Sequence, residues 1–168
     1  INEIVEWLSL EDYEIRVVTG IPNYPSGRFH NGFGFKSIFR TTYRNNVIVN
    51  RLPLIPRGSG NYFMLSLNYI SYFLSALIFT IFLLFKKRYD YIFVHHTSPI
   101  LIAIHPILYS LFFKRTKNYL WDLDIWPESL KAIGILKSSL LETIILKSIN
   151  YIYSYYDKIM ISSNGLKN

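Results

Sequence analysis

Three carboxylates stand close together in the segment W-D-L-D-I-W-P-E-S, between an apolar run and a helical pattern. They are Asp122, Asp124 and Glu128. A carboxylate at the end of a strand can act as a general base or accept hydrogen bonds from sugar hydroxyls. Asp124 or Glu128 could equally cap the following helix. Metal binding is conceivable, but Mg²⁺ usually also needs substrate phosphates, and the spacing is not specific for it.

Two adjacent histidines form a second candidate, in H-H-T-S-P, where a strand ends and a helix begins. His95 and His96 could donate hydrogen bonds or accept a proton, and the helix N-terminus after Thr97 favours a phosphate. Successive side chains of a strand point to opposite faces, so we expect at most one histidine to face a binding crevice. A packed structural role is the alternative for either one.

A third candidate is the segment G-I-P-N-Y-P-S-G, residues 20–27, which also follows a strand. Loops at the carboxyl ends of strands line the binding crevice of an α/β sheet. This placement makes Asn23 and Tyr24 candidates for ligand binding. Glycine and proline also punctuate ordinary surface turns, which is the alternative.

Positive charge is concentrated in one part of the chain. The net charge is +7, and residues 21–60 contain basic side chains interleaved with aromatic ones and no acid. This combination binds single-stranded nucleic acid or the phosphates of a membrane surface. No RNP, helix-turn-helix or zinc-finger pattern occurs, and a long apolar segment follows, so we expect a membrane and no nucleic acid. The basic residues expected at the membrane are Arg28, Lys36, Arg40, Arg57, Lys86, Lys87 and Arg88.

Short β-branched runs alternate with longer apolar segments along the chain. The expected strands are 14–19, 38–43, 47–52, 91–96, 118–123 and 158–162; the expected helices are a segment before Glu14, 61–85, 99–113, 128–137 and 139–156. This alternation predicts an α/β fold, a Rossmann-like parallel sheet with helices on both faces. The length of 168 residues predicts one domain. The lack of cysteine excludes a disulfide scaffold, Cys-type zinc sites and a cysteine nucleophile.

Two uncharged runs raise an alternative, a polytopic membrane protein with spans at 64–85 and 91–113. The second run contains H-H-T-S-P, which is costly in hydrocarbon and natural in a strand-to-helix turn. The first run carries Asn68, Ser71 and Ser75 on one side, which suits a helix with one face on a sheet and another facing something polar. We therefore favour the α/β fold, with the helix 61–85 partly in the membrane interface.

Four stretches of the chain together resemble the amino-terminal domain of family 4 glycosyltransferases. The group that looks closest contains bacterial enzymes of O-antigen and capsular polysaccharide synthesis, including fucosamine transferases. The stretches are V-V-T-G-I-P-N-Y-P-S-G (17–27), R-L-P-L-I-P (51–56), N-Y-I-S-Y (68–72) and D-I-W-P-E-S-L (124–130). The first and the last, in this order, are together fairly specific, and the resemblance spans nearly the whole chain.

The resemblance implies a GT-B architecture, with the active site between two Rossmann-like domains, retention of anomeric configuration, and no essential metal or cofactor. A nucleotide-sugar donor would bind mainly to a carboxy-terminal domain. A polyprenyl-diphosphate-linked sugar acceptor would bind to the amino-terminal domain, at the cytoplasmic face of the bacterial inner membrane, with peripheral attachment. Residues 1–168 would then be the acceptor-binding domain without its first strand and without the donor domain, and we expect them to be inactive alone.

The resemblance also implies roles for individual residues. Asp124 corresponds to a polar group near the reacting sugar, where it would orient or deprotonate the attacking hydroxyl. One of the two histidines corresponds to the family's histidine, although T-S-P stands here where a Pro-Pro pair is usual. The residues expected to bind the acceptor are Asn23, Tyr24, His95, His96, Thr97, Trp126 and Glu128.

Overall fold

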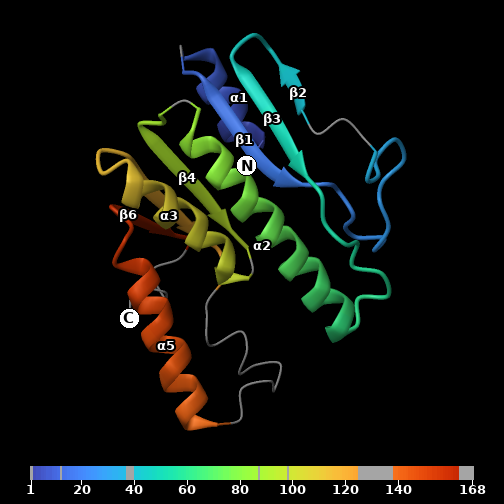
Figure 1. Ribbon diagram of the computed structural model, residues 1–168, viewed down its shortest axis with the longest axis vertical. Coiled ribbons are helices and arrows are strands. Elements are labelled where there is room, and N and C mark those ends of the chain that lie inside the picture. The colour runs from blue at the N-terminus through green and yellow to red at the C-terminus, as the bar shows by residue number, and fades with distance from the viewer. Residues whose placement is uncertain are drawn as a thin grey trace. The chain divides into compact units, whose positions relative to one another are not determined.

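The structure, a computed structural model, describes residues 2–11, 13–36, 40–86, 88–97, 99–124 and 138–162 (Figure 1). Contacts within the chain divide it into two compact units, Ile1–Phe79 and Thr80–Asn168. Each unit has its own three-stranded sheet. The helix predicted at 128–137 lies outside the described residues, as do Trp126 and Glu128.

The first unit combines a parallel and an antiparallel strand pair. It contains α1 (Asn2–Leu10), β1 (Ile15–Gly20), β2 (Arg40–Tyr43), β3 (Val47–Leu52) and most of α2 (Tyr62–Leu84). β1 runs parallel to β3 with Ile15 opposite Val47, and β2 runs antiparallel to β3 with Tyr43 opposite Val47. The strand expected at 38–43 is therefore confirmed for its described part, and a turn that contains Asn45 and Asn46 joins it to β3 as a hairpin.

The helix α2 is built as its sequence predicts, without glycine or proline between its ends. The side-chain oxygen of Asn61 accepts a hydrogen bond from the Met64 N–H at 2.9 Å, which caps the first turn. The side chains of Asn68 and Ser75 donate to the carbonyl oxygens of Ile55 and Pro53, both at 2.6 Å. The polar side of this helix thus holds the backbone that follows β3.

One side of α2 is apolar and exposed. The exposed residues recur at intervals of three and four: Phe63, Ile70, Leu74, Ile78, Ile81, Phe82 and, just past the helix end, Phe85. This spacing places them on one stripe, which we call the α2 stripe. The helix therefore exposes an apolar stripe, where an ordinary surface helix exposes polar residues, and buries Ala76 and Leu83 on another side.

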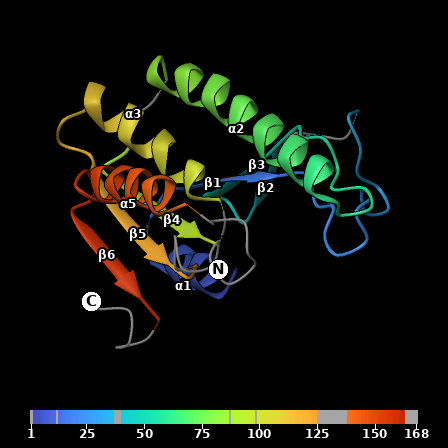
Figure 2. The same cartoon turned by 90° about the horizontal axis from the view of Figure 1, so that it is seen from below.

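The second unit has an entirely parallel sheet in the order β4-β5-β6. Its elements are β4 (Tyr91–His96), the 3₁₀ helix η1 (Ile100–Ala103), α3 (Ile104–Phe112), β5 (Lys117–Asp122), α5 (Ser139–Tyr153) and β6 (Lys158–Ile161). The helix predicted at 99–113 thus begins as a 3₁₀ turn after Pro99. Figure 2 shows α3 and α5 over the same face of this sheet.

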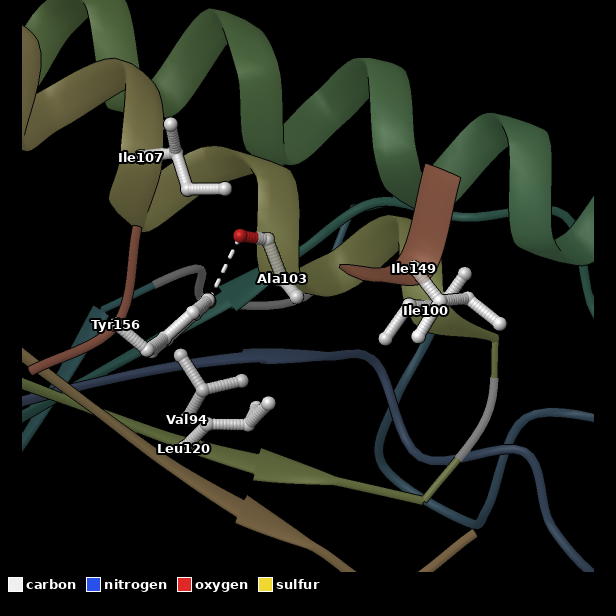
Figure 3. Close-up of a cluster of buried hydrophobic side chains, with 7 residues drawn as sticks. All are labelled: Val94, Ile100, Ala103, Ile107, Leu120, Ile149 and Tyr156. Atoms are coloured by element: carbon white, nitrogen blue, oxygen red, sulfur yellow. Dashed lines mark hydrogen bonds between the residues drawn. The ribbon is translucent and has the colours of Figure 1, made fainter. Parts of the chain in front are cut away.

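The core of the second unit lies between its sheet and these helices (Figure 3). Val94 of β4 and Leu120 of β5 pack with residues of η1, α3 and α5, namely Ile100, Ala103, Ile107 and Ile149, and with Tyr156. The hydroxyl of Tyr156 donates to the buried carbonyl oxygen of Ala103 at 2.7 Å. Even-numbered residues of β4 and β5 therefore point toward the helices, because side chains alternate along a strand.

Two sequence expectations are corrected. The first is a single parallel sheet: the described strands form one three-stranded sheet in each unit, and the sheet of the first unit contains an antiparallel pair. The second is the membrane span at 91–113, which is wrong because residues 91–96 form a strand paired with β5 and residues 100–112 form η1 and α3. Among the described residues, α2 alone has the length and apolar composition that crossing a membrane needs. The mixed α/β class is confirmed.

Candidate active site

The last residues of β4 and β5 form a buried hydrogen-bonded pair. His96 is opposite Asp122 in the parallel register, and both side chains point to the helix-covered face. His96 is fully buried and Asp122 is 7% exposed. The Nδ1–H of His96 donates to Oδ1 of Asp122 at 2.6 Å, a short, charge-assisted hydrogen bond.

The carboxylate of Asp122 accepts two more hydrogen bonds. The hydroxyl of Tyr153, the last residue of α5, donates to its Oδ2, and the backbone N–H of Asp124 donates to its Oδ1 at 3.3 Å. Burial opposes ionisation of Asp122, but the hydrogen bonds from His96, Tyr153 and Asp124 outweigh it, so the pKa of this carboxyl lies below its ordinary value. Asp122 is therefore a carboxylate at neutral pH.

The proton arrangement of His96 follows from the charge of Asp122. An ionised carboxylate can only accept hydrogen bonds, so the shared proton belongs to Nδ1 of the imidazole. The other ring nitrogen, Nε2, is buried and has no hydrogen-bond partner among the described residues. A buried nitrogen without a partner costs free energy, and such atoms mark places where a ligand, an ion or a water completes the hydrogen bond.

His95 points away from this cluster. Its ring lies edge-on to that of Trp121, with centroids 5.2 Å apart, on the face where Tyr91 and Phe93 are exposed. Burial lowers the pKa of His95 below its ordinary value. The two histidines thus point to opposite faces of the sheet, as alternation along a strand predicts, and His96 is the buried one.

The other predicted residues of this strand end are placed as follows. Asp124 directly follows Leu123 after β5 and is partly buried, and its N–H is part of the cluster. Thr97 is exposed beyond the end of β4. No group of three metal-ligating side chains occurs within residues 2–11, 13–36, 40–86, 88–97, 99–124 and 138–162.

In the first unit, the loop that follows β1 places its two predicted acceptor-binding residues, Asn23 and Tyr24, in different environments. Asn23 is buried, and its amide bridges the Ile21 carbonyl and the Arg57 N–H. Tyr24 is exposed. Of the basic residues predicted at a membrane, Lys87 lies outside the described residues, Arg57 is half-buried, and the exposed ones are Arg28, Lys36, Arg40, Lys86 and Arg88.

Sequence reasoning missed Tyr153 and the pairing of Asp122. Asp122 was one of three carboxylates, and the strand expected at 118–123 ended one residue too late to put it opposite His96. The signal that could have found the pair is the equal length of two parallel strands, one ending in histidine and one in aspartate. Tyr153 carries no local signal, because it reaches Asp122 from 31 residues away.

The cluster of His96, Asp122 and Tyr153 can do specific chemistry. A carboxylate that fixes the tautomer of an imidazole leaves the second nitrogen to accept a hydrogen bond or a proton. Comparison of the chain with protein-family models finds no matching family, and a search of curated proteins finds no match. The function is therefore inferred from the sequence motifs and from this cluster.

Proposed function

We propose that this chain is the acceptor-side domain of a retaining GT-B glycosyltransferase that builds a bacterial surface polysaccharide. Its substrates would be a nucleotide sugar and a polyprenyl-diphosphate-linked sugar, without a cofactor or metal. Two features support the proposal: the four motifs of the sequence, and parallel strands that end in a buried His96–Asp122 pair. The pair carries most weight, since binding sites of α/β sheets form at the carboxyl ends of strands.

The reaction exchanges one bond at the anomeric carbon of the donor sugar. The bond to the nucleotide diphosphate breaks, and a bond to the acceptor hydroxyl oxygen forms. The proton of that hydroxyl passes to Asp124, the base that the family resemblance implies. His96, through Nε2, accepts a hydrogen bond from a sugar hydroxyl, and Asp122 with Tyr153 holds the imidazole in the tautomer that this requires.

Peripheral attachment to the cytoplasmic face of the inner membrane belongs to the same proposal, because the acceptor is a lipid. The α2 stripe supplies exposed apolar area, and Lys86 and Arg88 follow it with exposed charges. No acidic residue occurs between Glu14 and Asp90. An apolar stripe on a helix without acidic residues, followed by cations, matches an anionic lipid surface, in which apolar side chains insert among acyl chains and cations meet phosphates.

The test is transfer of sugar by the whole protein that carries this chain, with His96→Asn as the decisive variant. An asparagine amide can still donate to Asp122 in place of Nδ1–H, but nothing replaces Nε2. We expect kcat to fall at least about 100-fold while the circular dichroism and the melting temperature stay near those of the wild type. Leu140→Asn, a substitution at an exposed residue of α5, is the control and should leave kcat unchanged.

Three results would contradict the proposal or one of its parts. Full transfer by His96→Asn would make the pair a structural feature only, and full transfer by Asp124→Asn would remove Asp124 from the mechanism. Absence of transfer with every nucleotide sugar tried would overturn the glycosyltransferase assignment itself.

A further inference from the structure

Arg57 is held between two tyrosine rings in the first unit. Its Cζ atom lies 5.3 Å from the ring centroid of Tyr24 and 5.6 Å from that of Tyr69. Tyr24 belongs to the loop after β1, Arg57 to the segment after β3, and Tyr69 to α2. Contact with two aromatic faces fixes the plane of a guanidinium and leaves its N–H edge free to bind.

The backbone around Arg57 is fixed as well. Its N–H donates to the buried side chain of Asn23 at 3.2 Å, and the N–H of Gly58 donates to the carbonyl oxygen of Gly27 at 2.9 Å. These bonds join the segments after β1 and β3, which lie side by side near the first turns of α2 (Figure 1). The guanidinium is therefore preorganised, so little conformational entropy is lost when it binds.

The guanidinium N–H groups of Arg57 have no hydrogen-bond acceptor and no carboxylate partner among the described residues. Two other arginines of this unit differ in this respect, since Arg51 donates to the Thr41 hydroxyl at 2.7 Å and Arg16 to the Asn50 side chain at 3.0 Å. A half-buried cation with five unused donors is suited to an anionic ligand.

Charge in the first unit is distributed to favour an anion at this place. The described acids Glu3, Glu6, Glu11 and Glu14 all precede β1. The amide of Asn46, just before β3, donates to the carbonyl oxygens of Ser9 and Tyr13, which puts that acidic segment at the amino ends of the strands. The segments that carry Arg57 follow the carboxyl ends, away from the acids.

We propose that Arg57, clamped by Tyr24 and Tyr69, binds a phosphate or diphosphate group. The planar guanidinium offers two parallel N–H groups to two phosphate oxygens, and the exposed side of Tyr24 leaves room for the remainder of the ligand. The inference rests on the proposed function only for the source of the phosphate, which is the diphosphate of the lipid-linked acceptor or that of a soluble nucleotide.

The experiment titrates inorganic pyrophosphate into the full chain by isothermal titration calorimetry, with no transfer reaction involved. We expect Arg57→Gln to weaken pyrophosphate binding at least about tenfold. Arg57→Lys should weaken it by a smaller factor, since lysine keeps the charge but loses the two parallel N–H groups of the guanidinium. The matched control is Arg44→Gln, which removes the same charge from the β2–β3 turn, where Arg44 lies over the ring of Tyr43. Arg44→Gln should change the affinity less than twofold.

Equal losses in Arg57→Gln and Arg44→Gln would show a general charge effect and overturn the proposal, as would absence of pyrophosphate binding by the folded wild type. Tyr24→Leu keeps the loop and removes one ring, and undiminished binding by this variant would overturn the clamp. Competition distinguishes the sources: uridine diphosphate displacing pyrophosphate indicates a nucleotide, and vesicles with polyprenyl diphosphate displacing it indicate the lipid. Pyrophosphate binding that depends on Arg57 in a protein without transferase activity would separate this inference from the proposed function.

Discussion

His96 and Asp122 are the last residues of adjacent parallel strands and are opposite each other in the register, with Nδ1 2.6 Å from Oδ1. Their pairing follows from the parallel arrangement, in which strands of equal length that start together also end together. The helix-covered face then buries both side chains, and burial makes their hydrogen bond stronger than it would be in water. The strand ends thus fix the imidazole of His96, and its Nε2 has no hydrogen-bond partner in the part of the chain that the structure describes.

The pH dependence of stability should contain a contribution from Asp122. Because its pKa is lower in the folded than in the unfolded protein, its ionised form stabilises the fold at pH values above the unfolded pKa, about 3.9. This contribution is lost as the pH falls through the lower, folded pKa. In urea unfolding between pH 7 and pH 2, Asp122→Asn should lack this part of the acid-induced loss, and at pH 7 it should be about 1–3 kcal/mol less stable than the wild type. If the variant loses as much unfolding free energy between pH 7 and pH 2 as the wild type does, Asp122 is not held as a carboxylate by these hydrogen bonds.

The hydroxyl of Tyr156 should stabilise the second unit measurably. It donates to a buried carbonyl oxygen of Ala103, and burial raises the pKa of this tyrosine, so it stays a donor at all ordinary pH values. Tyr156→Phe leaves the carbonyl without its partner and should cost about 1–2 kcal/mol of unfolding free energy in urea. Tyr151→Phe removes a hydroxyl from an exposed ring and should change stability by no more than about 0.5 kcal/mol. Equal losses in the two variants would argue against the buried hydrogen bond.

The α2 stripe should determine binding to membranes. Ile78→Asp places a charge at the most exposed aliphatic residue of the stripe and should weaken sedimentation with anionic vesicles about tenfold, since the insertion of one aliphatic side chain is lost. Leu140→Asp introduces the same charge at an exposed leucine of α5 and serves as the control. Vesicle binding that drops equally in both variants, or in neither, would remove the stripe from the membrane contact.

Two glycines with positive φ should differ in their response to alanine. Gly27 has φ 71°, and a Cβ atom there would clash with the carbonyl oxygen of Gly58. Gly32 has φ 84° and open space around the position of a Cβ atom. Gly32→Ala should cost about 1 kcal/mol, the backbone term alone. Gly27→Ala must also move the segment of Gly58, so we expect a larger loss of unfolding free energy and weaker pyrophosphate binding. Similar losses in both variants would mean that the two segments are not held together.

The sequence by itself determined the elements, because hydrophobic periodicity, capping and turn signals act over a few residues. Strands were predicted within one or two residues at 14–19, 47–52 and 91–96, and the helix expected at 61–85 is found as α2. The polar side of α2 was also visible in advance. The partners of this polar side could not be predicted. The carbonyl oxygens of Pro53 and Ile55 accept hydrogen bonds from Ser75 and Asn68 only after the chain has folded back.

The tertiary structure alone decided which polar side chains meet. The alternation of side chains along β4 predicts that His95 and His96 lie on opposite faces of the sheet. Only the packing of one face against η1, α3 and α5 decides that His96 is the buried one. The choice of Asp122 as its partner depends on a strand register between segments 26 residues apart. The same holds for Tyr153 on that carboxylate and for Arg57 between Tyr24 and Tyr69. Local propensity carries no information on contacts of this kind, because they are selected by the packing of the whole unit.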